Sequence, residues 1–168
     1  CTAVCLFLLR KDHRAVTRLS WLSAGLGLIV STFLVHRVMV LGPQAVSLGS
    51  WPAPFGIVFA ADLLSAAMVW VSWLIGMGIA VYSAADLRLS PSYSRYQLLI
   101  QFLLAGVSGA FLTGDLFNLY VWFEVMLIAS FGLMVLDAGR VRIDGSIKYV
   151  LLNLVSTLTF LLAIGLLY

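Results

Sequence analysis

The stretch GDLFNLYVWFEVMLIASFGLMVL, residues 114–136, decides the fold class of this chain. It exceeds the roughly 20 apolar residues that an α-helix needs to cross a bilayer. Yet it carries a carboxylate, Glu124, near its middle, and another, Asp115, at its start. A charged side chain at the centre of a membrane helix costs about 2.5–3.5 kcal/mol on insertion scales. The stretch therefore predicts a membrane-spanning helix whose central acid is kept for a function.

The composition of the whole chain agrees with a membrane protein. Of its 168 residues, 62% are hydrophobic and 10% are charged, and the mean hydropathy is +1.08. Soluble domains have about 45–50% apolar and ~25% charged residues. The net charge of +3 does not indicate a nucleic-acid partner, because the basic residues lie between apolar runs rather than on one solvated face.

Five apolar runs long enough to span a membrane follow a shorter run at the amino terminus. We expect strands to be absent, because lipid admits only helices and closed barrels and no period-2 alternation occurs. The predicted fold is all-α, a polytopic transmembrane helix bundle that forms a single integral-membrane domain over 1–168. We expect its first helix to be truncated and the chain to be a fragment. The predicted helices cover residues 1–9, 20–41, 56–84, 96–113, 115–136 and 147–168.

The basic residues alternate between the connections. Nine of the ten lysines and arginines lie in 10–18, 86–95 and 137–148, and the intervening connections have none. Cytoplasmic loops carry an excess of Lys and Arg, so these three loops are predicted to be cytoplasmic and the chain to lie in the cell membrane. The tenth, Arg37, is near a helix end and can extend to the interface. Its neighbour His36 is expected to have an interfacial role.

Glu124 is the strongest candidate for a functional residue. Its neighbours Trp122, Phe123 and Val125 offer no hydrogen-bonding partner. Desolvation disfavours the charged form of a carboxyl, so an acid here can change its charge as its surroundings change, as a proton pathway requires. The alternative is a permanently neutral glutamate that hydrogen-bonds to another helix for packing.

Three other ionisable residues are candidates for the same pathway. Asp115 opens the helix of Glu124, where it is either a helix cap or a functional acid. Asp62, two turns inside its predicted helix, either pairs with a neighbouring helix end or takes part in an ion path. Lys148, predicted to open the last helix, is either a cytoplasmic anchor or a stepping stone towards Glu124.

Two predicted helices carry polar stripes that either join helices by hydrogen bonds or line a water-filled channel leading to the central acid. The members are Gln97, Gln101 and Ser108 on one helix and Asn153, Ser156 and Thr157 on the other. No phosphate-binding loop, zinc motif, nucleophile elbow or haem ligand pair occurs in the sequence. We therefore predict no cofactor, no metal and no enzymatic activity.

Three segments resemble one family of membrane proteins. They are WPAPFGIVFAADLLSA at 51–66, TGDLFNLYVWFEVMLIASFGLMVL at 113–136 and GSIKYVLLNLVST at 145–157. They are similar to the antiporter-like subunits that Mrp-type sodium/proton antiporters share with respiratory complex I, and most of all to the D-subunit branch of the Mrp antiporters. The resemblance covers nearly all of the chain.

The resemblance implies a subunit of about fourteen helices built from inverted repeats, of which this chain would be the first part. It implies that Glu124 corresponds to the proton-transferring glutamate of the family. Lys148, Asp62 and Asp115 would correspond to charged residues of the same motifs. The implied partners are the other subunits of a hetero-oligomeric antiporter, the lipid bilayer, protons, and Na⁺ or another monovalent cation.

The predicted function is proton translocation within a multisubunit Na⁺/H⁺ antiporter. One alternative is a proton-pumping subunit of a redox complex, either NADH:quinone oxidoreductase or a membrane-bound hydrogenase. Such relatives have the same glutamate, but the segments GDLFNLYV and WPAPFGI favour the Mrp branch. A second alternative is a purely structural subunit, against which the intact motifs around Glu124 argue.

Overall fold

A computed structural model of the chain describes residues 6, 13–48, 56–87, 90, 92–136 and 139–167. Each of the five helices in this part is long and apolar enough to cross a membrane, which confirms the predicted polytopic bundle. The first predicted helix, at 1–9, lies outside the described residues apart from Leu6. The elements are α2 (His13–Leu41), β1 (Gln44–Leu48), β2 (Ile57–Ala61), α3 (Leu63–Asp86), α4 (Tyr93–Leu112), α5 (Leu116–Val135) and α6 (Arg140–Leu167).

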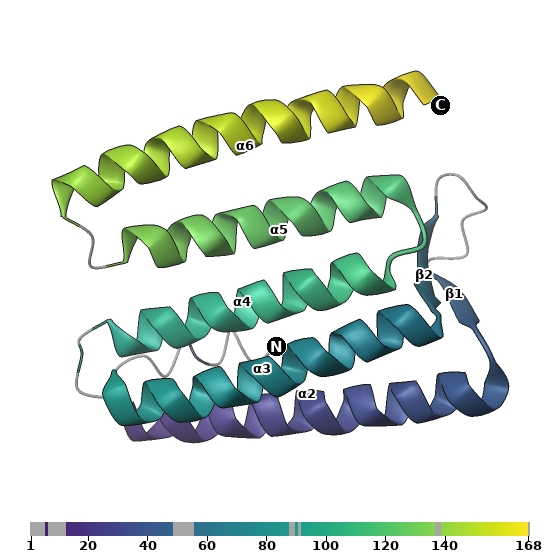
Figure 1. Ribbon diagram of the computed structural model, residues 1–168, viewed down its shortest axis with the longest axis horizontal. Helices are drawn as coiled ribbons and strands as arrows, with labels where there is room; N and C mark the ends of the chain where they lie inside the picture. Colours follow the sequence, from purple (N-terminus) through teal and green to yellow (C-terminus); the bar gives the residue numbers. More distant parts are fainter. Residues whose placement is uncertain are drawn as a thin grey trace.

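The helices lie side by side along the bundle, and the chain reverses direction at each connection (Figure 1). Consecutive helices are neighbours: α3 contacts α2 and α4, while α5 contacts α4 and α6. One end of the bundle holds the start of α2 and the α3–α4 and α5–α6 connections; we call it the basic end. The other holds β1, β2 and the α4–α5 turn, and we call it the hairpin end (Figure 1). The described parts of the three basic segments thus lie at one end of the molecule.

The predicted absence of strands is wrong, because β1 and β2 form an antiparallel hairpin with Gln44 opposite Ala61 and Leu48 opposite Ile57. The hairpin lies beyond the ends of α4 and α5 (Figure 1), and the rule against open sheet edges applies only within the hydrocarbon region. Periodicity does not distinguish a short apolar run such as β2 from the start of a helix. Gly42, with φ of 77°, ends α2 ahead of the hairpin.

The third helix begins at Leu63, not at residue 56, because Asp62 caps it. The Ser65 amide donates to Asp62 Oδ1 at 2.7 Å, and the Asp62 amide donates to Ser65 Oγ at 2.9 Å. This reciprocal capping box satisfies amides that a helix start leaves free. The prediction that Asp62 lies two turns inside the helix is therefore wrong. The Ser65 amide, followed by the Ser65 hydroxyl, lowers the pKa of the Asp62 carboxyl below its ordinary value of 3.8.

Several helices also extend into the polar flanks of their apolar runs. The clearest case is α6, which begins at Arg140 rather than at residue 147, because a polar segment that adjoins an existing helix can extend it at one hydrogen bond per added residue. Lys148 therefore does not open the helix. It lies two turns inside α6 and pairs with Asp144 one turn earlier, at 3.0 Å.

A buried set of polar side chains joins α2, α3 and α4. We call Ser20, Ser83, Tyr93 and Gln97 the Gln97 cluster, and all four residues are fully buried. The Gln97 amide accepts from Ser20 Oγ at 3.0 Å and donates to Ser83 Oγ at 2.6 Å and to the Tyr93 hydroxyl at 3.2 Å. Interhelical hydrogen bonds in membrane proteins contribute about 0.6 kcal/mol each on average. One side chain thus links three helices.

The interface between α4 and α5 depends instead on glycine. A Cβ atom at Gly106 would lie 2.7 Å from Met126 Cγ and 3.2 Å from the Met126 amide nitrogen, and one at Gly109 would overlap the Trp122 ring. Small residues let membrane helices approach closely without polar contacts. The two glycines therefore set the distance between the helices.

We predict that Gly109→Ala lowers the melting temperature of the full-length protein in detergent, because overpacking costs about 1–3 kcal/mol. The matched control is Gly78→Ala in α3, where an added Cβ has no atom within 4 Å. That variant should be neutral or more stable, since alanine exceeds glycine in helix propensity by up to about 1 kcal/mol. Equal melting temperatures for the two variants would contradict the interpretation of the α4–α5 interface.

Candidate functional site

Glu124 lies close to the middle of α5. It is eight residues after Leu116 and eleven before Val135, which corresponds to about 12 Å and about 16 Å along the helix axis. Its side chain is half-buried. Its Oε1 atom is buried and has no hydrogen-bond partner among the described residues. The carboxyl is thus deep in the spanning segment and, on this oxygen, unsatisfied.

The contacts of its neighbours show which way Glu124 faces. Trp122 packs against Gly109 of α4, and the Phe123 ring meets the Phe160 ring of α6 edge-on, with centroids 6.4 Å apart. Successive helical residues are about 100° apart. Glu124 is therefore about 200° from Trp122, on the side of α5 away from α4.

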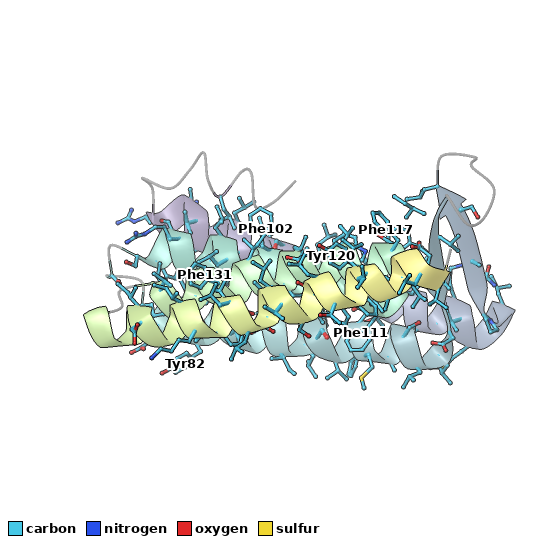
Figure 2. The ribbon with its side chains drawn as sticks, turned by 90° about the horizontal axis from the view of Figure 1, so that it is seen from above. Tyr82, Phe102, Phe111, Phe117, Tyr120 and Phe131 are labelled. Atoms are coloured by element: carbon cyan, nitrogen blue, oxygen red, sulfur yellow. The ribbon has the colours of Figure 1, made fainter. Side chains whose placement is uncertain are left out.

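The face of α5 that carries Glu124 is largely open in this chain. Phe117 and Ile128, at i−7 and i+4, share that face and are 54% and 65% exposed. Tyr120, at i−4, is also on it, and its ring centroid is 6.4 Å from that of Phe117. Figure 2 shows Phe117 and Tyr120 on the side of the bundle away from Tyr82 and Phe111. Glu124 thus belongs to an aromatic face that α4 does not cover.

Asp115 links the start of α5 to the hairpin. Its Oδ1 accepts from the Asn118 amide at 2.6 Å, which caps α5, and its Oδ2 accepts from the Val58 amide of β2 at 3.1 Å. The Gly114 amide donates back to the Val58 carbonyl at 2.7 Å. Both carboxylate oxygens are therefore engaged. The hydrogen bond from the Asn118 amide confirms that Asp115 caps α5. Its role in proton transfer remains a prediction.

Lys148 and Asp62 lie at opposite ends of the bundle. The ion pair of Lys148 with Asp144 is at the basic end, and the two side chains are 72% and 70% exposed. Asp62 is exposed at the hairpin end, where its carboxylate caps α3. Neither residue hydrogen-bonds to Glu124 among the described side chains. The structure does not bring the four predicted pathway residues together.

The first polar stripe faces away from α5. Gln97 is buried and hydrogen-bonds to α2 and α3, and Gln101 is buried one turn further along α4. Gly106, half a turn round the helix from Gln97, contacts α5, as does Gly109. Ser108 is on the same face as the glutamines and donates to the carbonyl of its own helix at Leu104, at 2.7 Å. Helix α4 therefore separates this stripe from Glu124.

The second stripe bonds within its own helix. Asn153 Nδ2 donates to the Tyr149 carbonyl at 2.9 Å, and Thr157 Oγ1 donates to the Leu154 carbonyl at 3.1 Å. Ser156 is exposed. These side chains leave the surface of α6 polar in its middle without joining it to α5 through a hydrogen bond among the described residues.

Sequence reasoning found Gln97 but missed its three partners. Ser20 and Ser83 are single small residues near the ends of predicted helices, and Tyr93 lies in the predicted loop 86–95, where an aromatic residue is expected at the membrane interface. One signal was present: Ser20, Ser23, Gly27 and Ser31 recur at i, i+3, i+7 and i+11, which places small residues on one face of α2.

Comparison with known proteins places these features in a family. Residues 113–168 match the family described as NADH:quinone oxidoreductase/Mrp antiporter, TM. The D subunit of the Na(+)/H(+) antiporter of Bacillus subtilis (strain 168) is 41% identical over 99% of this chain and 34% of that protein. The chain spans about a third of the length of the curated relatives it matches.

Solved structures share the fold. The Mrp complex from Dietzia sp. DQ12-45-1b contains a chain that superimposes with a TM-score of 0.87 at 28% identity, covering 99% of this chain and 32% of that one. A chain of the membrane-bound sulfane sulfur reductase, an archaeal respiratory membrane complex, superimposes with a TM-score of 0.91 at 23% identity, covering 99% and 34%. The second likeness is one of fold alone.

The chain is a multi-pass membrane protein and belongs to the antiporter-like subunit family that Mrp antiporters share with complex I. Within that family it is similar over its whole length to the D subunits of Na⁺/H⁺ antiporters. The resemblance inferred from the motifs around Glu124 and Lys148 is confirmed.

We predict that Asp115→Ala loosens both the start of α5 and its attachment to the hairpin. Loss of an N-cap costs about 0.5–2 kcal/mol. Hydrogen exchange at the Asn118 and Val58 amides should therefore accelerate in the full-length protein. Asp144→Ala, which removes an exposed acid at the other end, is the control and should leave both amides unchanged. Unaltered exchange in Asp115→Ala would show that its two hydrogen bonds do not hold these segments.

Proposed function

We propose that this chain is part of the proton-translocating subunit of a multisubunit monovalent cation/proton antiporter, and that Glu124 carries the proton. The observation that carries the proposal is the unpaired, buried Oε1 of a carboxyl in the middle of a spanning helix. A structural glutamate would have its oxygens satisfied by neighbours, since an unpaired buried acceptor costs about 1–3 kcal/mol.

The chemistry of the site fits proton binding better than cation binding. A single carboxyl in an aromatic environment binds a proton without further ligands, whereas hard cations need several oxygen ligands. Among the described residues, no group of three or more His, Cys, Asp or Glu converges. In the proposal, the Glu124 carboxyl binds the proton that is transported and passes it on when water or a cation reaches its open face.

The name of the relative supports the coupling of this proton to a cation. The Bacillus subtilis protein is named as the D subunit of a Na(+)/H(+) antiporter, and the Dietzia structure is of an Mrp complex. By analogy, the partners of this chain are the other subunits of such a complex and the lipid bilayer. The redox-complex alternative draws on a likeness of fold to a respiratory membrane complex.

The charge distribution supports an orientation in the cell membrane. Arg14, Arg18, Arg95 and Lys148 all belong to the basic end. By the positive-inside rule the basic end is cytoplasmic and the hairpin is outside.

The first experiment uses the full-length gene with its companion subunits in everted vesicles from a host that lacks its own sodium/proton antiporters. Wild type should collapse a respiration-generated pH gradient when sodium is added. Glu124→Gln, at matched abundance, should give the response of an empty-vector host, because glutamine cannot exchange a proton. Asp86→Asn, which removes an exposed acid at the end of α3, is the control for removal of an acid and should transport normally.

Two outcomes would contradict the proposal. Normal transport by an assembled Glu124→Gln variant would remove Glu124 from the proton path. If sodium and other monovalent cations have no effect in the wild type while electron donors drive proton pumping, the redox-complex function replaces the antiporter.

The orientation is tested separately, by a membrane-impermeant thiol reagent applied to intact cells. In a variant with Cys1 and Cys5 replaced by alanine, Ser47→Cys in β1 should be labelled from outside. Ser90→Cys, at the basic end, should be labelled only after the cells are opened. The reverse pattern would invert the predicted topology.

A further inference from the structure

One face of α2 is not covered by any other described element. The buried residues Ala24, Ser31 and Val38 recur every seven positions on the face that packs against α3 and α4. The opposite face carries exposed side chains at alternating steps of four and three residues. We call this row the outer stripe, and its members are Leu22, Leu26, Ile29, Phe33, His36 and Val40.

The spacing of the outer stripe suits contact with another helix. Side chains that recur every 3.5 residues on average form the seam of a left-handed helix pair. From Leu22 to Val40 the stripe rises over 18 residues, or about 27 Å, which nearly matches the roughly 30 Å of a hydrocarbon core. Lipid also covers apolar helix faces, so the spacing alone does not distinguish a partner helix from lipid.

Two ionisable residues on this face make that distinction. His36 belongs to the stripe and Arg37 adjoins it, four residues before the end of α2 at Leu41, and both side chains are exposed. Ionisable residues in membrane helices almost always face a protein interior or a water-filled cavity, where they find partners. Here both face away from the bundle. This face of α2 is therefore expected to lie inside a larger assembly.

The Arg37 side chain lies along the stripe rather than beyond the end of α2. Its Cζ atom is 5.8 Å from the centroid of the Phe33 ring, which is one turn closer to the basic end. Helical side chains tilt towards the start of their helix, and α2 starts at the basic end (Figure 1). An arginine that reached for the nearer interface would extend the other way. The charge is thus held one turn inside the spanning helix.

The described acids at the hairpin end do not neutralise Arg37. Asp62 and Asp115 use their carboxylates to cap α3 and α5, and neither forms an ion pair with Arg37. A carboxylate can form two parallel hydrogen bonds with a guanidinium. The missing partner of Arg37 is therefore expected to be an acid from outside the described bundle.

We propose that the outer stripe is the docking surface for a transmembrane helix of a companion subunit, and that this helix places a carboxylate beside Arg37. The docking surface rests on the proposed function only because it requires a multisubunit complex. It is at the opposite edge of the bundle from α6 (Figure 1), so it does not depend on the role of Glu124. The competing occupant is an anionic lipid, which supplies a phosphate but no helix along the stripe.

A glycine beside the stripe leaves room for a partner to approach closely. A Cβ atom added at Gly25 would have no atom within 4 Å. Gly25 is on the same flank as His36, because eleven residues make almost three full turns. Small residues at contacts between membrane helices let the two backbones come together. The docked helix would fill the space above Gly25.

The occupant is identified by photo-crosslinking in native membranes that contain the full-length protein and its companion subunits. Leu26, within the outer stripe, is replaced by the photoreactive residue benzoylphenylalanine. The expected product joins this protein to a spanning segment of one companion subunit, which mass spectrometry of the cross-linked peptide identifies. Products with lipid alone, or with other parts of the same protein alone, would overturn the proposal.

The contacts are tested by the yield of that product. Arg37→Glu should lower the yield at least about tenfold, because loss of a buried charge pair weakens an interface by that much or more. Replacing the facing acid of the companion helix by arginine should restore it. Gly25→Leu should also lower the yield, whereas Gly78→Leu in α3, where an added Cβ is equally free of contacts, should not. A yield unchanged by Arg37→Glu and Gly25→Leu would contradict docking on this face.

The cross-link is independent of transport. Glu124→Gln should assemble and cross-link as the wild type does, so a failure of Glu124 as the proton carrier leaves the docking surface intact. Conversely, a complex that exchanges sodium for protons but gives no protein cross-link at Leu26 would overturn the docking surface alone.

Discussion

In the hydrocarbon region, a polar side chain on a helix must find its partner inside the protein, and the Gln97 amide meets this constraint for three helices at once. Its oxygen accepts from α2 and its nitrogen donates to α3 and to the first turn of α4. The cluster is near the basic end of the bundle. With its members fully buried, the cluster fixes α2, α3 and α4 relative to one another, and the rest of the chain is built onto this unit.

The attachment of α5 is of a different kind. Along its length it meets α4 through glycines and large apolar side chains, and its polar bonds to the rest of the bundle are at the hairpin end. Contacts between apolar surfaces have little directional preference, whereas hydrogen bonds have a strong one. Among the described residues, the helix that carries the proposed proton carrier is thus held by hydrogen bonds at its start and by apolar packing in its middle.

Hydropathy predicted which segments span the membrane, and charge alternation predicted which connections share an end, because both depend on the lipid rather than on neighbouring helices. The predictions from sequence were wrong where a local interaction determines where a helix starts or whether a strand forms. The capping box of Asp62 and Ser65 fixes the start of α3 seven residues after the start of the apolar run. The residues before it form a strand of the hairpin, and their apolar sequence is compatible with either a strand or a helix. The motif identified Glu124 without reference to contacts. Its direction, away from α4, could be inferred only once Trp122 was seen against Gly109.

Strand β2 has a consequence for the depth of the central carboxyl. Its last residue, Ala61, leads directly into the cap of α3, and its Val58 amide is bonded to the cap of α5. The strand therefore aligns the first turns of two spanning helices at one level, at the hairpin end of the bundle. From that level, nine residues lead from Asp115 to Glu124, or about 13 Å of helix rise. A two-stranded element at the hairpin end thus determines how far the Glu124 carboxyl lies from that end of the bundle.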